Sequence, residues 1–164
     1  MAAIGHELVS LLPRLRRFAL ALTRSPSLAD DMVQSACEKA LLNAEQWTPG
    51  TRLDAWVFRI LHNAWIDHLR QHKADVILDD VRNHEDRLMD HSHGEHEVIS
   101  KLTLTDVQRA IAELPTEQRE VLVLVCVEDL AYREAAEILG VPVGTVMSRL
   151  ARARKRIFEA THAA

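Results

Sequence analysis

Six polar and basic side chains near the carboxyl end of the chain have the types and the spacing needed to read DNA. Two hydroxyl groups come first and four cations follow: Thr145, Ser148, Arg149, Arg152, Lys155 and Arg156. Hydroxyl and guanidinium groups hydrogen-bond to base edges in the major groove, and arginine and lysine also neutralise phosphates. At about 100° per residue, all six project away from an apolar stripe of the same helix. We therefore expect a DNA-recognition helix, the simpler alternative being a solvated basic helix end that favours the helix dipole.

The residues before and within this helix indicate a helix-turn-helix. Residues 131–139 are good helix formers, Gly140 tolerates a left-handed backbone, and Pro142 is accepted where a new helix begins. The small residues Ala136 and Gly140 leave room for two helices to cross closely. The second helix is expected to face the first with a single apolar stripe, made by Val143, Val146, Leu150, Ala153 and Ile157.

A second basic face is expected on a helix at residues 52–72, where Thr51 with Asp54 predicts the N-cap. The apolar side of this helix consists of Leu53, Val57, Ile60, Leu61 and Ala64, extended by Phe58, Trp65 and Leu69. The opposite side carries Arg52, Arg59, Asn63 and Arg70, an arrangement suited to following a phosphate backbone. Trp56 borders this face and is expected either to stack on a base or to pack in the core, whereas Trp65 is expected in the core.

The composition favours an all-α protein of one medium domain or two small ones. The chain has 164 residues, of which 48% are hydrophobic but only 4% aromatic, with five glycines and five prolines. Such a chain is poor in the residues that build turns and strands. The net charge of −4 does not exclude DNA. Between residues 75 and 97 acids outnumber arginines by eight to two, so an acidic middle separates two more basic flanks.

An acidic face is expected on the second helix of the chain. A first helix spans about residues 4–23, a Ser-Pro-Ser turn follows, and Ser27 is placed to cap the next helix, with Asp30 three residues on. The exposed side of that helix would carry Asp30, Asp31, Gln34 and Glu38. These acids either compensate the helix dipole or form a docking face for a basic partner helix.

Helical spacing fades after residue 73 and resumes near Val98, so residues 74–97 are interpreted as a linker. A helix then ends near Leu114, and Pro115 is placed to begin the next one. The apolar run at residues 121–127 fits either a buried strand or a buried helix. Its position between two expected helices favours the helix.

The only plausible metal ligands lie in this linker. His91, His93 and His96, with Glu95 beside them, sit in an acidic segment that contains glycine, which favours a solvated linker over a zinc site. No metal or other cofactor is expected. The sequence contains no phosphate loop, nucleophile elbow or His-Glu-x-x-His pattern, so nothing in it indicates an enzyme.

The cysteines and the hydropathy favour a soluble cytoplasmic protein. Cys37 and Cys126 each lie within an apolar helical pattern and are expected to be reduced, buried small residues. The first apolar run is interrupted by proline and arginines, unlike a secretory signal, and no stretch reaches the ~20 apolar residues of a membrane span. No membrane insertion is expected.

Three segments, in their order and spacing, resemble an extracytoplasmic-function (ECF) sigma factor of bacterial RNA polymerase. Residues 15–41 surround Ala-Asp-Asp-Met-Val-Gln, residues 52–70 form the helix with the second basic face, and residues 114–156 include Leu-Pro-Thr-Glu-Gln-Arg-Glu-Val-Leu and Val-Pro-Val-Gly-Thr-Val-Met-Ser-Arg-Leu. The resemblance implies two small helical domains, sigma region 2 at residues 1–73 and sigma region 4 at residues 98–164, joined by the linker at 74–97. It also implies binding to core RNA polymerase, at its β′ clamp and β flap, and to promoter DNA, with restraint by an anti-sigma factor.

The same resemblance implies roles for particular residues. The residues with which the family docks on the polymerase clamp correspond to Asp30, Asp31 and Gln34. The part of the family that binds the −10 element and captures an unstacked base corresponds to the loop and helix that carry Trp47, Thr48, Thr51, Arg52, Trp56, Arg59, Asn63 and Arg70. The helix that reads the −35 element corresponds to residues 143–156. Asp129 stands where glycine is common in the family.

Two other functions remain open at the level of sequence. One is a helix-turn-helix transcriptional regulator that is not a polymerase subunit, although residues 1–73 show neither an effector cleft nor a heptad pattern for a dimer. The other is a protein-interaction module or a zinc-dependent protein built around the linker histidines.

Overall fold

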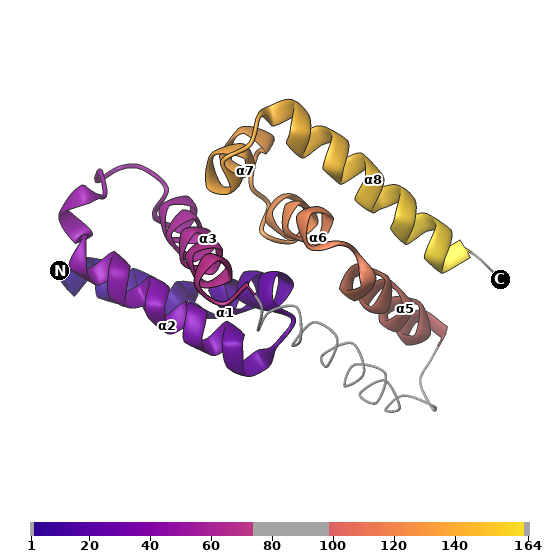
Figure 1. Cartoon of the computed structure of the whole chain (residues 1–164), viewed down its shortest axis with the longest axis horizontal. Coiled ribbons are helices and arrows are strands. Elements are labelled where there is room, and N and C mark those ends of the chain that lie inside the picture. Colours follow the sequence, from indigo (N-terminus) through magenta and orange to yellow (C-terminus); the bar gives the residue numbers. More distant parts are fainter. Residues whose placement is uncertain (1, 74–98, 163–164) are drawn as a thin grey trace.

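The structure, a computed structural model, describes residues 2–73 and 99–162, and all regular elements in these two ranges are helical (Figure 1). The α-helices are α1 (Ala2–Thr23), α2 (Pro26–Leu42), α3 (Leu53–Gln71), α5 (Ile99–Glu113), α6 (Thr116–Leu122), α7 (Tyr132–Leu139) and α8 (Val143–His162). A 3-10 turn at Ala44–Gln46 and a π-helical turn at Val123–Val127 complete the described elements. The all-α prediction is confirmed. The predicted linker and its histidines lie outside the described residues.

Helices α1, α2 and α3 pack together as the amino-terminal half. Phe18 of α1 and Phe58 of α3 are fully buried and meet edge to face, with 5.5 Å between ring centroids. Trp65 is also buried, as predicted. Two predicted caps are wrong. The N-cap of α2 is Ser25, whose hydroxyl accepts from the N–H of Leu28, because Pro26 already occupies the first helical position.

The second wrong cap lies at the start of α3. Its N-cap position is Arg52 and has no side-chain cap, whereas the hydroxyl of Thr51 donates to the carbonyl of Thr48 at 2.6 Å. The carboxylate of Asp54 accepts from the N–H of Ala55 at 2.8 Å and pairs with arginines instead of completing a capping box. Sequence spacing alone did not distinguish a capping acid from an acid engaged in ion pairs.

Helices α5 to α8 form the carboxyl-terminal half, in which α8 packs against α5, α6 and α7. The apolar run after Pro115 is helical, as predicted, but its second part widens into the π-helical turn at Val123–Val127. The chain leaves this turn through Asp129, whose φ of 58° is left-handed. A left-handed backbone is the conformation for which glycine is preferred, which explains why glycine is common at this position.

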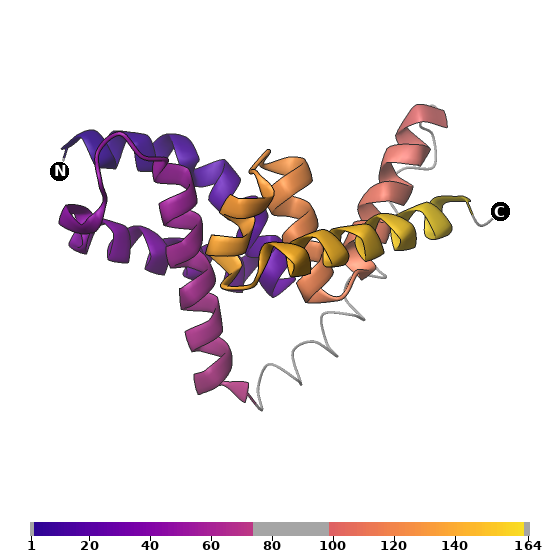
Figure 2. The same ribbon diagram turned by 90° about the horizontal axis from the view of Figure 1, so that it is seen from above.

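The two halves pack against each other along α1 and α3. α1 lies against α6 and the π-helical turn, and α3 lies against α7 (Figures 1 and 2). Buried apolar residues of both halves form one continuous cluster. Arg119 of α6, only 2% exposed, donates to the backbone carbonyl of Ala21 in α1 and to that of Leu114. This packing has no counterpart among the sequence-based expectations.

Candidate nucleic-acid interface

The helix-turn-helix is formed by α7 and α8, as predicted. Gly140 follows α7 with a left-handed φ of 69°, and its N–H donates to the carbonyl of Ala136 at 2.9 Å. The carbonyl of Pro142 accepts from the N–H of Thr145 at 3.0 Å, so the proline immediately precedes α8. Val146, Leu150 and Ala153 are buried and Ile157 is half-buried. Val143 is the exception to the predicted stripe, because it lies at the first turn and is 39% exposed.

The outer face of α8 carries the six predicted DNA-reading side chains, four of them exposed and two half-buried. Ser148, Arg152, Lys155 and Arg156 are exposed, and Thr145 and Arg149 are half-buried. Within the described part of the chain, none of the four cations on this face forms an ion pair. Their charges are therefore available to phosphates, as the sequence predicts for a recognition helix.

The second basic face also has the predicted exposure. Arg52, Arg59, Asn63 and Arg70 are exposed along α3, and Arg70 lies 4.0 Å from Asp67 on the same helix. Trp56 is half-buried and packs against the core, so both of its predicted roles remain compatible with its position.

In the loop before α3, one predicted site residue is half-buried and two are exposed. Trp47 is half-buried and packs against the core, and its indole N–H is buried with no hydrogen-bond partner among the described residues. Thr48 and Thr51 are exposed. Gly50 has a φ of 90°, which lets the loop turn back toward α3.

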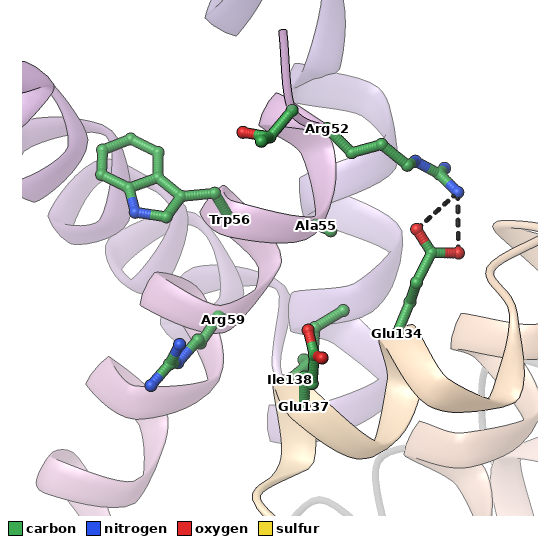
Figure 3. Close-up of a pocket in the computed structure, with 8 residues that line it drawn as sticks. Arg52, Ala55, Trp56, Arg59, Glu134, Glu137 and Ile138 are labelled. Carbon is green, nitrogen blue, oxygen red and sulfur yellow. Dashed lines mark hydrogen bonds and ion pairs between the residues drawn. The ribbon is translucent and has the colours of Figure 1, made fainter. Parts of the chain in front are cut away.

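The carboxyl-terminal half covers one end of the second basic face. A cavity of about 280 Å³ lies between α3 and α7 (Figure 3). Its walls come from Thr51, Arg52, Ala55, Trp56 and Arg59 on one side and from Glu134, Glu137 and Ile138 on the other. The guanidinium group of Arg52 points toward Glu134, and its Nη1 lies 2.9 Å from both carboxylate oxygens.

Arg52 is also held by Asp54 on its own side of the cavity. Its Nε and Nη2 donate to the two carboxylate oxygens of Asp54 at 3.1 Å and 2.7 Å. The hydrogen bond with Asp54 is the main reason that the pKa of Arg52 is raised. Burial by itself would raise the pKa of Asp54, but hydrogen bonds from Arg52, from the N–H of Ala55 and from Arg14 outweigh it and lower that pKa.

The acidic face of α2 is exposed as predicted. Asp30, Asp31 and Gln34 all lie at the surface, while Ala29 and Met32 on the other side of the helix are buried. Asp30 pairs with Arg16 of α1 at 3.0 Å. Among the described residues, Asp31 and Gln34 form no ion pair across to another helix.

Sequence reasoning missed the charged residues that join the two halves. Glu128, with a side chain 1% exposed, accepts from Arg14 at 2.7 Å and from Arg17 at 2.9 Å. His62 and Glu120, both buried, lie 3.4 Å apart across the same interface. The available signal was the position of Glu128 directly after a seven-residue apolar run, where an acid would be buried and would need a partner.

The two cysteines differ in exposure, and neither belongs to a cluster of metal ligands among the described residues. Cys37 and Cys126 are both free; burial raises the pKa of the Cys37 thiol, whereas Cys126 is exposed, which corrects the prediction that it is buried. The described residues contain no group of three or more metal-ligating side chains. Among those residues, no helix is both long and apolar enough to cross a membrane.

Both basic faces lie in segments with known relatives. Residues 8–74 match the family Sigma-70 region 2, and residues 104–157 match the family Sigma-70, region 4. The two matches together place the chain in the sigma-70 class of transcription proteins.

Individual relatives show to which family within the sigma-70 class the chain belongs. The ECF RNA polymerase sigma factor EcfG of Rhodopseudomonas palustris (strain TIE-1) is 33% identical over 155 residues, which cover 94% of this chain and 83% of that protein. The ECF RNA polymerase sigma factor SigW of Bacillus subtilis (strain 168) is 33% identical over 136 residues, 79% of this chain and 73% of that protein. The chain belongs to the ECF sigma factors of bacterial RNA polymerase, as the sequence motifs predicted.

Solved structures share the fold over nearly the whole chain. The sigma factor RpoE, in a co-crystal structure with the anti-sigma factor NepR from Bartonella quintana, has a TM-score of 0.73 and 29% identity, covering 98% of this chain and 97% of that one. CnrH, in complex with the cytosolic domain of CnrY, has a TM-score of 0.66 and 25% identity, covering 99% of this chain and 89% of that one.

Proposed function

We propose that this sigma factor directs RNA polymerase through two separate DNA contacts. The outer face of α8 reads the −35 element: Thr145, Ser148 and Arg149 reach base edges, and Arg152, Lys155 and Arg156 lie along phosphates. The observation that carries this assignment is the row of cations on α8 that have no ion-pair partner among the described residues.

The −10 element binds to α3 and the loop before it. Arg52, Arg59, Asn63 and Arg70 follow the backbone, and Trp47, Thr48, Thr51 and Trp56 surround the place of an unstacked base. Melting needs such a capture, because unstacking costs on the order of a few kcal/mol per step and must be offset by contacts to the flipped base.

The remaining contacts concern other proteins. The exposed acids Asp30 and Asp31, with Gln34, dock on the β′ clamp of core polymerase, and the carboxyl-terminal half reaches the β flap. The structural neighbour RpoE was solved in complex with the anti-sigma factor NepR, and CnrH was solved in complex with the cytosolic domain of CnrY. We propose that this chain is restrained in the same way and acts in the cytoplasm as a regulatory, not an enzymatic, subunit.

The division of labour follows the chain. Residues 1–73 would serve polymerase and −10 binding, residues 98–164 would serve −35 binding, and residues 74–97 would connect them. The match to sigma region 2 as well as region 4 favours this arrangement over a stand-alone helix-turn-helix regulator, which would need only the second.

The decisive experiment is run-off transcription with core polymerase over a library of genomic promoters. We expect added protein to select a set of start sites with shared −35 and −10 sequences. Core polymerase that starts at the same sites with and without the protein would overturn the proposal.

A further inference from the structure

An apolar strip runs along the outer surface of the first turns of α8. It consists of Val143, Met147 and Ala151, which follow one another every four residues and therefore lie on one side of the helix. All three are exposed, Val143 by 39% and Met147 by 52%. Met147 and Ala151 do not belong to the buried stripe of α8, so the packing of the helix does not require them.

The position of the strip distinguishes it from other exposed apolar residues. A single exposed apolar side chain needs no explanation, and Leu104 on α5 is an example. The strip, however, borders the residues placed to read bases. At about 100° per residue, Met147 lies to one side of Ser148 and Arg149 lies to the other. The base-reading end of α8 is thus divided lengthwise into an apolar flank and a polar flank.

Small residues around Met147 allow a close approach to the apolar flank. Gly144 lies on this side of α8, and a Cβ added there would meet open space. Ala151, one turn further along, adds only a methyl group. Met147 therefore projects beyond both neighbours, and its flexible thioether can adapt to the surface that it meets.

The neighbouring serine restricts which base pair fits this flank. The hydroxyl of Ser148 donates its hydrogen to the carbonyl of Thr145 at 3.1 Å, so toward DNA it can only accept. In the major groove, adenine and cytosine present an amino donor, and thymine alone presents a methyl group. An acceptor beside an apolar side chain therefore matches an A·T pair, which presents both groups.

We propose that Met147, with Ala151 beside it, is a further specificity-determining residue of α8 and reads the C5-methyl group of a thymine in the −35 element. The proposal rests on the proposed function, in which α8 lies in the major groove at that element. Contact between the thioether and the methyl group removes both from water, which favours thymine over every base that lacks the methyl group.

The test uses holoenzyme assembled from the full chain and core polymerase, together with duplexes of a promoter selected by run-off transcription. In each duplex, one thymine of the −35 element on either strand is replaced by deoxyuridine, which lacks only the methyl group and forms the same base pair. Met147→Ala and Met147→Leu are compared with the parent and with the control Phe158→Ala. Phe158 is 61% exposed toward the far end of the same helix, where it stacks on His162.

Gel-shift titrations measure the affinity for each duplex. We expect the parent to bind thymine at one position about fourfold more tightly than deoxyuridine, which is the effect of burying one methyl-sized group. Met147→Ala should bind the two duplexes equally, whereas Met147→Leu, which keeps an apolar side chain of similar size, and Phe158→Ala should retain the preference.

Several results would overturn the reading of a methyl group by Met147. They are a −35 element without an A·T pair, a parent that prefers thymine at no position, a preference that survives in Met147→Ala, and a preference that is lost in Met147→Leu or Phe158→Ala. A protein that selects no start site in run-off transcription fails the proposed function itself. It is thereby distinguished from one that selects promoters without sensing the methyl group.

Discussion

The carboxylate of Glu128 lies 2.7 Å from Nε of Arg14 across the junction of the two halves, although the two residues are 114 positions apart in the chain. The same carboxylate accepts from Arg17, and its side chain is 1% exposed. Arg14 also lies 5.4 Å from the ring centroid of Phe58. A buried acid with two cationic donors holds both halves in one register.

Glu128→Ala should therefore destabilise the whole protein. Removing the acid leaves Arg14 and Arg17 facing an apolar junction, and because both remain partly exposed, we expect a loss of about 2 kcal/mol in the free energy of unfolding. Urea denaturation followed by circular dichroism measures it. Arg16→Gln is the control, since Arg16 and Asp30 are both exposed and their pair should be worth less than about 1 kcal/mol. Equal effects of the two substitutions would contradict the role of Glu128.

Asp54 should make the stability depend on pH in the acid range. Its pKa is lowered in the folded chain from the ordinary value of 3.8, so its ionised form stabilises the fold fully above pH 3.8. This contribution is lost as the pH falls through the folded-state pKa. We expect Asp54→Asn to lower the free energy of unfolding near neutral pH and to have progressively less effect below pH 3.8.

The measurement compares Asp54→Asn with the parent by urea denaturation at several pH values. Asp106→Asn, an exposed acid on α5, is the control for loss of a carboxylate. A cost of Asp54→Asn that stays constant through the acid range would show that ionised Asp54 does not stabilise the fold.

The sequence predicted most elements because their signals are local. Gly140 and Pro142 define the turn between α7 and α8 from residue type alone, and the apolar spacing of α3 correctly placed Trp65 in the core and Arg59 at the surface. The capping residues Ser27 and Thr51 were wrong, since a serine or threonine near a helix start has several possible partners.

The junction between the halves could not be predicted from such signals. Arg17 and Arg16 are adjacent arginines on one helix, yet only Arg17 reaches Glu128, and that difference depends on how α1 lies against the π-helical turn. Pairing between residues distant in sequence depends on tertiary packing, which one sequence does not specify through its periodicity. The position of Glu128 directly after an apolar run was the one local sign in the sequence that this acid would be buried and would need a partner.

The same substitution at two glycines of the helix-turn-helix should destabilise the protein at one position and not at the other. Gly140 has a φ of 69° and open space where a methyl group would be added, so Gly140→Ala should cost about 1 kcal/mol through backbone strain alone. Gly144 lies inside α8 with the same open space and no left-handed φ, so Gly144→Ala should be neutral or stabilising by up to about 1 kcal/mol. Thermal unfolding of both variants checks the signs, and a stabilising Gly140→Ala would contradict the turn geometry.

Reversing one charge on α2 should weaken polymerase binding. Asp31 is exposed on the acidic face, so Asp31→Arg should reduce the affinity for core polymerase by charge repulsion while leaving the fold intact. A pull-down of core polymerase at several salt concentrations measures the effect. Asp106→Arg makes the same change on an exposed position of α5 and should retain binding. If both variants bind polymerase equally well, the acidic face of α2 is not the docking site.

Arg149→Ala and Arg152→Ala should weaken recognition of the −35 element without loss of polymerase binding. Arg149 is half-buried near the base-reading end of α8, so its loss should cost about 1–3 kcal/mol and relax sequence preference. Arg152 is exposed further along the helix, so its loss should weaken all sequences alike and reduce the salt dependence of binding. Gel-shift titrations of the holoenzyme on a selected promoter and on a −35 mutant separate the two effects. Arg109→Ala, an exposed arginine on α5, should match the parent, and promoter binding unchanged in both α8 variants would remove α8 as the −35 reader.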